Sequence, residues 1–123
     1  MSEPVGPETF RRLVEAAESG QLYLEPDATE NCVKACDTFL EALQFIRNSC
    51  SELEVSAAFG HLPSAHALGL KFDAKATGPG GLSDVLQTHI DTVTQMRAMF
   101  AAAGKAYREA DHETLTALRE ASG

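Results

Sequence analysis

In two long segments of this sequence, mostly apolar residues recur at alternating spacings of three and four residues. This feature constrains the fold most strongly. In the first segment the repeat runs through Cys32, Cys36, Phe39, Leu43, Ile46, Cys50 and Leu53. In the second it runs through Leu82, Leu86, His89, Val93, Met96, Phe100, Ala103 and Tyr107. Such a repeat forms a stripe along one side of an α-helix and is typical of helices that pack lengthwise. The sequence therefore predicts two long helices that pair through these stripes.

Helix-breaking residues set the expected limits of the two long helices. Pro26 suits a first helical turn, so the first long helix should begin there. It should end near Phe59, where Gly60 can cap it. The strongest break is "TGPGG" at residues 77–81, after which the second long helix should run to about Ala121. At about 45 and 60 Å, the helices differ enough in length for the second to extend past the first if they pair antiparallel.

Two shorter helices complete the predicted fold. "GPETFRRLVEAAESGQ" reads as a helix that Gly20 ends, with its apolar stripe at Phe10, Leu13, Val14 and Ala17. A second short stripe lies in the connection between the long helices, at Ala65, Leu68, Phe72 and Ala76. We therefore expect an all-α fold: residues 1–25 form a short helix and a connector, and residues 26–121 form a long antiparallel helical hairpin with a short helix in its connection.

The charge balance and the absence of leader-like segments exclude several classes of partner. The chain carries 18 acidic and 10 basic residues, a net charge of -8, and no basic stripe that could neutralise phosphates. We therefore expect no nucleic-acid partner. The N-terminus lacks the pattern of a cleavable signal peptide, and no stretch approaches ~18 consecutive apolar residues, so no membrane insertion is expected. Three cysteines without a CxxC pair indicate folding in a reducing compartment.

Metal binding and catalysis have weak sequence support. Cys32 and Cys36 lie one helical turn apart and could supply two zinc ligands. A histidine would have to complete such a site, from the set His61, His66, His89 and His112. Both thiols lie on the apolar stripe, however, where a free cysteine acts as a small hydrophobic residue. No nucleophile motif surrounds a serine or cysteine, and "GPGG" lacks the lysine of a phosphate-binding loop. We expect no metal, no cofactor and no enzymatic activity.

His89 lies on the predicted stripe of the second long helix. Its usual role there is that of a neutral, hydrogen-bonded histidine in a core or an interface. The alternative is a pH switch, since histidine titrates near neutral pH.

A tyrosine and an acid stand four residues apart near the end of the second long helix. Tyr107 and Asp111 fall in an uninterrupted helical pattern, so they should be neighbours on one face. Tyr23 and Asp27 repeat the spacing, but Pro26 lies between them, and the residue before a proline is biased away from helix. Only the later pair should be presented together. In an alternative interpretation, Tyr107 continues the stripe and packs its ring, with its hydroxyl in water.

These features together resemble the WXG-like and Esp-type helical proteins of actinobacterial type VII (ESX) secretion, over roughly residues 26–121. The resemblance implies that Phe59 and Gly60 form the turn motif where other members have Trp-x-Gly. It also implies that Tyr107 and Asp111 act as a YxxxD secretion signal. The chain has no tryptophan, a longer connection and an additional N-terminal segment, so it looks more like an Esp-type protein than a core WXG protein.

The resemblance implies a secreted, non-enzymatic substrate or co-secreted partner, cytoplasmic before export and exported without a cleavable signal peptide. It would pair with another helical protein, as a hetero- or homodimer, into a four-helix bundle and be recognised by the type VII machinery. The alternative is a cytosolic helical chaperone or adaptor for a type VII effector, not itself secreted. The residues expected to pack the hairpin and the partner are Cys36, Phe39, Leu43, Ile46, Leu86, Val93, Met96 and Phe100. Apolar residues beside the stripes, Val33, Leu40, Val85 and Ile90, provide more apolar surface than one hairpin contact needs.

Overall fold

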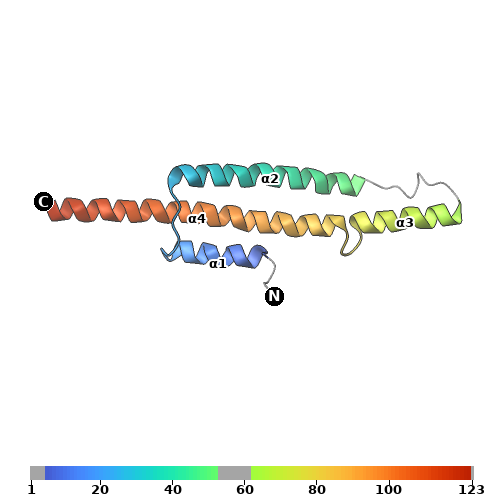
Figure 1. Ribbon diagram of the computed structural model, residues 1–123, viewed down its shortest axis with the longest axis horizontal. Coiled ribbons are helices and arrows are strands. Elements are labelled where there is room, and N and C mark those ends of the chain that lie inside the picture. Colours follow the sequence, from blue (N-terminus) through green and yellow to red (C-terminus); the bar gives the residue numbers. More distant parts are fainter. Residues whose placement is uncertain (1–4, 53–61, 123) are drawn as a thin grey trace. The chain divides into compact units, whose positions relative to one another are not determined.

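The structure is a computed structural model that describes residues 5–52 and 62–122. Within these residues the chain is helical, with no strand, which confirms the all-α fold (Figure 1). The four helices are α1 (Pro7–Glu18), α2 (Pro26–Glu52), α3 (Pro63–Thr77) and α4 (Leu82–Ser122). The predicted starts of both long helices and the predicted end of the second agree with these bounds. The predicted end of the first long helix, at Phe59 and Gly60, lies outside the described residues, as do Leu53 and His61.

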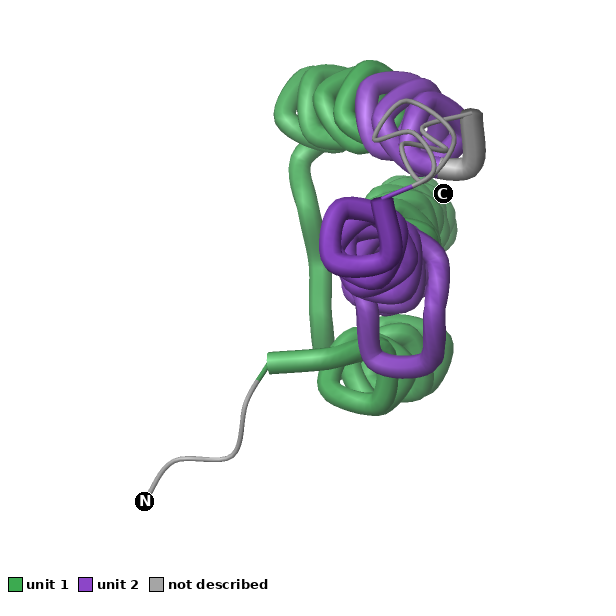
Figure 2. Tube along the Cα trace, turned by 90° about the vertical axis from the view of Figure 1, so that its right-hand side faces the viewer, with its two compact units in different colours: residues 1–39, 92–123 green, residues 40–91 purple. Residues whose placement is uncertain are grey.

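The chain divides into two compact units, which Figure 2 distinguishes by colour. Unit 1 consists of residues 1–39 and 92–123, and unit 2 of residues 40–91. The first part of α2 and most of α4 therefore belong to unit 1, together with α1. The second part of α2 and the start of α4 belong to unit 2, together with α3.

In unit 1, α2 runs antiparallel to α4. Near the start of α2, Thr29 lies against Gly104 so closely that a Cβ atom at Gly104 would stand 2.5 Å from Thr29 Cγ2. Two turns later along α2, Asp37 accepts a hydrogen bond of 2.5 Å from Arg97 Nε of α4. The two side chains also form an ion pair. The contact therefore moves back along α4 as the chain advances along α2. This is the hairpin pairing that the two apolar repeats predicted.

The short helix α1 packs on the other side of α4 (Figures 1 and 2). Ala17 is the most buried residue of α1, with 1% of its surface exposed, and it lines a surface hollow together with Ala102 and Ala106 of α4. Small side chains on both helices allow their backbones to approach closely. As predicted, Phe10, Leu13 and Val14 share this partly buried side. In unit 1, α4 therefore lies between α1 and α2.

Because α4 packs on two sides in unit 1, its buried residues follow the predicted stripe only in part. Arg97 and Gly104, seven residues apart, face α2, whereas Ala102 and Ala106 face α1. Of the predicted stripe, Leu86, Val93 and Ala103 are buried, whereas Met96 and Phe100 are half-buried. The buried apolar residues of α4 are Leu86, Ile90, Val93, Met99, Ala103 and Ala106.

His89 does not lie in the core of the chain, because its side chain is exposed, while Ile90 next to it is buried; a role in an interface stays a prediction. His89 lies off the line of positions on α4 through which Leu86, Ile90 and Val93 are buried. The predicted stripe has two rows: the row of Leu86 and Val93 is buried, and the row of His89 and Met96 lies at the edge of the contact.

The stripe of α2 is narrower than predicted. The buried positions of this helix are spaced by seven residues, at Thr29, Cys36, Leu43 and Cys50. Phe39 and Ile46, which alternate with them in the predicted stripe, are 53% and 46% exposed. A helix that packs on one neighbour covers a narrow line of positions, so the second row of the repeat lies at the edge of the contact.

In unit 2, Arg47 of α2 donates a hydrogen bond to Gln87 of α4. The break before α4 is confirmed: Gly80 has a φ of +74°, a conformation that favours glycine, and its N–H donates to Asp84 Oδ2 at 2.8 Å. The helix predicted in the connection is α3, but two residues of its apolar stripe are exposed, Leu68 at 49% and Phe72 at 55%.

Candidate functional site

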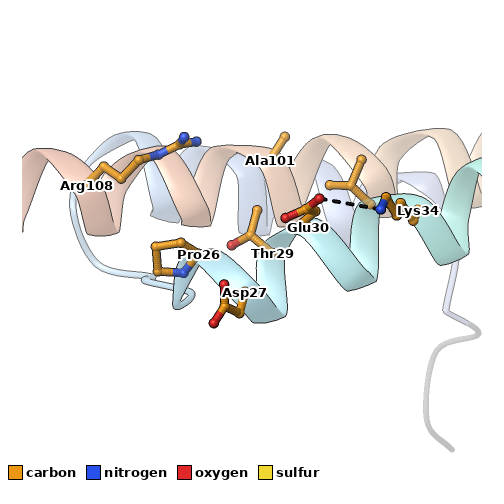
Figure 3. Close-up of a pocket in the computed structure, with 8 residues that line it drawn as sticks. Pro26, Asp27, Thr29, Glu30, Lys34, Ala101 and Arg108 are labelled. Atoms are coloured by element: carbon orange, nitrogen blue, oxygen red, sulfur yellow. Dashed lines mark ion pairs between the residues drawn. The ribbon is translucent and has the colours of Figure 1, made fainter.

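Tyr107 and Asp111 lie on α4 where this helix passes the start of α2. Pro26, the first residue of α2, lines a surface hollow of about 430 Å³ with Arg108 of α4, so the two helices still face each other at this level (Figure 3). From Asp111 to Ser122 every residue of α4 is exposed. Tyr107 is 38% exposed. The pair therefore marks the boundary between the packed part of α4 and its exposed end.

A second recess brings the two tyrosines of the chain together. It has a volume of about 280 Å³ and is lined by Tyr23, Tyr107, Ala110, Asp111 and Thr114. Tyr23 belongs to the connector between α1 and α2, residues 19–25, and is 51% exposed. As expected, Tyr23 is not on a helix with Asp27, but no sequence pattern indicated that it lies beside Tyr107.

Hydrogen bonds hold the connector on α4 next to this recess. The Leu24 N–H donates to the Ala103 carbonyl oxygen at 3.0 Å. Thr29, which is 8% exposed, donates from Oγ1 toward the carbonyl oxygens of Leu24 at 3.2 Å and Glu25 at 3.0 Å. Thr29 in turn packs against Gly104. Leu24 and Glu25, which follow Tyr23, are therefore hydrogen-bonded to α4 and to the first turns of α2.

Acidic groups dominate the exposed end of α4. Glu109 forms an ion pair with Lys105, with 3.9 Å between Oε1 and Nζ. Among the ion pairs of the described residues, none involves Asp111 or Glu113. Both carboxylates are exposed. This surface is suited to a partner that supplies positive charge.

The larger hollow at the start of α2 does not have a distinct ligand chemistry. It is lined by Pro26, Asp27, Thr29, Glu30, Val33, Lys34, Ala101 and Arg108 (Figure 3). Its two acids and two bases balance in charge, and Glu30 already pairs with Lys34 at 3.4 Å. The hollow is therefore a groove between two helices with solvated charges along its rim.

Two of the three cysteines are buried, Cys36 at 4% and Cys50 at 3% exposed, while Cys32 is half-buried. Burial raises the pKa of the Cys36 thiol above its ordinary value; Cys32 and Asp37 raise it further, and Arg97 lowers it. This thiol is therefore protonated at neutral pH and a poor nucleophile or metal ligand. Across residues 5–52 and 62–122, no three His, Cys, Asp or Glu side chains come together as a metal site would require.

The residues predicted to pack the hairpin and a partner fall into three groups. Four are buried: Cys36, Leu43, Leu86 and Val93. Met96 and Phe100 are half-buried, and Phe39 and Ile46 are exposed. Beside the stripes, Val33 and Leu40 are half-buried, and Val85 is exposed.

None of the helices, as far as the structure describes them, combines the length and the apolar character needed to cross a bilayer. Comparison with protein-family models, with curated proteins and with solved structures yields no match for this chain. The geometry of its own residues is therefore the basis for a functional proposal.

Proposed function

We propose that this chain is a non-enzymatic substrate or co-secreted partner of a type VII secretion system and that the export machinery recognises it through Tyr107 and Asp111. The observation that carries the proposal is the position of this pair. The two residues are four apart on α4, they line one surface recess, and the helix is exposed from Asp111 onward. A pair presented in this way can be read from the folded chain, without melting the helix.

The pairing of α2 with α4 supports the proposal, because the proteins that the sequence resembles are built on helical hairpins. Apolar side chains on α2 remain exposed, with Phe39 at 53%, Phe45 at 73% and Ile46 at 46%. A second helical protein could cover them and complete a four-helix bundle, as a hetero- or homodimer. The partner class that we propose is therefore a helical hairpin.

The test is export of single variants from a host that carries the matching secretion system. Tyr107→Ala and Asp111→Ala should each lower the amount in the culture filtrate about tenfold, the change expected for about 1.4 kcal/mol of lost recognition. The intracellular amount should stay unchanged. A cytosolic marker controls for lysis.

Glu120→Ala provides a matched control, because Glu120 is also an exposed acid on α4 but lies on the opposite side of the helix from Asp111. It should be exported like the parent chain. Normal export of both the Tyr107 and the Asp111 variant would refute the proposal that these two residues form a recognition signal, called the address below.

The second candidate function is a cytosolic helical chaperone or adaptor for a type VII effector. The exposed phenylalanines of α2 favour it equally, since a chaperone would use them to cover an apolar helix pair of its client. The same fractionation separates the two functions. A chaperone stays in the cell lysate, and its deletion lowers the export of the client.

A further inference from the structure

The recess beside Tyr107 contains a residue that no motif on α4 includes. Tyr23 comes from the connector, more than eighty positions earlier in the chain, and lines the recess with Tyr107 and Asp111. Both rings remain partly exposed, 51% for Tyr23 and 38% for Tyr107. Tyrosine side chains at such positions are frequent sources of binding energy, because a rigid ring buries a large area at low entropic cost.

The position of Tyr23 is set by the fold. Gly20, at the start of the connector, has a φ of +78°, which turns the chain after α1. A Cβ atom at Gly20 would lie 3.5 Å from Tyr23 Oη, so the tyrosine folds back over this turn. On the other side of Tyr23, the Leu24 N–H is bonded to the carbonyl oxygen of Ala103. The backbone that follows Tyr23 is therefore bonded to α4, and the tyrosine side chain lies over the turn at Gly20.

The charge near the recess indicates what it can receive. Asp111 is exposed, and it takes part in none of the ion pairs found in the described part of the chain. The chain as a whole has a net charge of -8. A receptor surface that approaches two tyrosine rings and a carboxylate would gain most from a basic side chain, and arginine can bind a carboxylate through two parallel hydrogen bonds.

We propose that the recognised address is assembled from two segments of the folded chain: Tyr23 of the connector joins Tyr107 and Asp111 of α4 in one surface. Its occupant is a basic receptor domain of the export machinery. This inference rests on the proposed function and adds a third recognition residue to it. It also means that the address exists only when the connector is docked on α4, so the machinery reads the folded state.

The decisive variant is Tyr23→Ala, tested in the same export assay. It should lower export about tenfold, as Tyr107→Ala does, because each removes a ring from the same surface. Tyr23→Phe keeps the ring and should be exported like the parent. Gln21→Ala is the matched control: Gln21 is an exposed connector residue that does not line the recess, so export should persist.

Thermal melting and the intracellular amount are measured for every variant, since a purely structural role of Tyr23 would lower both. Loss of export in Tyr23→Ala with an unchanged melting temperature supports the two-segment address. Normal export of Tyr23→Ala, while Tyr107→Ala and Asp111→Ala fail, would overturn it and leave the proposed function standing. Normal export of all three variants would refute both.

Discussion

Gly104 allows α2 to approach α4, because it has no side chain at the point where Thr29 of α2 lies against it. An alanine in the middle of a helix is normally favoured over glycine by about 1 kcal/mol. At this position its Cβ atom would stand 2.5 Å from both Cγ2 and Oγ1 of Thr29, far inside a normal contact. Thr29 cannot easily yield, since its hydroxyl bonds to two carbonyl oxygens of the chain before it.

We therefore expect Gly104→Ala to destabilise the chain by about 1–3 kcal/mol, the usual cost of overpacking a tight contact. Urea unfolding followed by circular dichroism measures this loss. In a Thr29→Ala background the same substitution should cost less, because the two nearest atoms are gone and only the Cβ atom of residue 29, at 2.9 Å, remains too close. A gain in stability from Gly104→Ala alone would show that the helices do not approach closely here.

At the scale of single helices, substitutions of Leu43 and Ile46 in α2 can show which part of the apolar stripe is buried. Leu43 is 6% exposed and Ile46 is 46% exposed, although the sequence placed both on one stripe. Leu43→Asp should cost about 3 kcal/mol or more, because it removes a buried side chain and introduces an unpaired charge. Ile46→Asp should change the free energy of unfolding of the isolated chain by less than about 1 kcal/mol. Equal losses in the two variants would place the contact on a different side of α2.

The sequence predicted the four helices well because each depends on local signals, such as Pro26 at a start and the glycines after Thr77 at a break. It predicted the buried residues of α4 only in part, because in unit 1 this helix also packs against α1. The alanines at 102 and 106 face α1 but carry too little hydrophobicity to stand out in a repeat that contains Met96 and Phe100. A helix with neighbours on two sides has no single stripe.

The candidate site was likewise only partly predictable from the sequence. The proximity of Tyr107 and Asp111 follows from their spacing on one helix and was predictable. The proximity of Tyr23 to Tyr107 depends on the path of the connector across α4, held by a backbone hydrogen bond from Leu24 that no side-chain pattern encodes. Contacts of this kind become visible only in the folded chain.

At the scale of the whole chain, the buried interior is small. Its hydrophobic residues include three alanines and two cysteines, and none of the large side chains that the structure describes is less than 2% exposed. Stability from burial scales with apolar area at about 25 cal/mol per Å². Large apolar side chains remain at the surface instead, with Phe45 at 73% exposed and Leu118 at 61%. A partner that covers some of them would stabilise the folded chain by mass action.

We therefore expect the melting temperature to depend on association. If the partner is a second copy, the melting temperature of the purified chain should rise over about a hundredfold increase in its concentration, and light scattering should report a dimer. If the partner is another helical protein, the rise should appear only when that protein is copurified from the native host. Ile46→Asp should weaken either association, because it places a charge on the exposed apolar side of α2, while the monomer keeps its stability. A chain that stays monomeric, melts independently of concentration and copurifies with no helical protein would contradict the pairing.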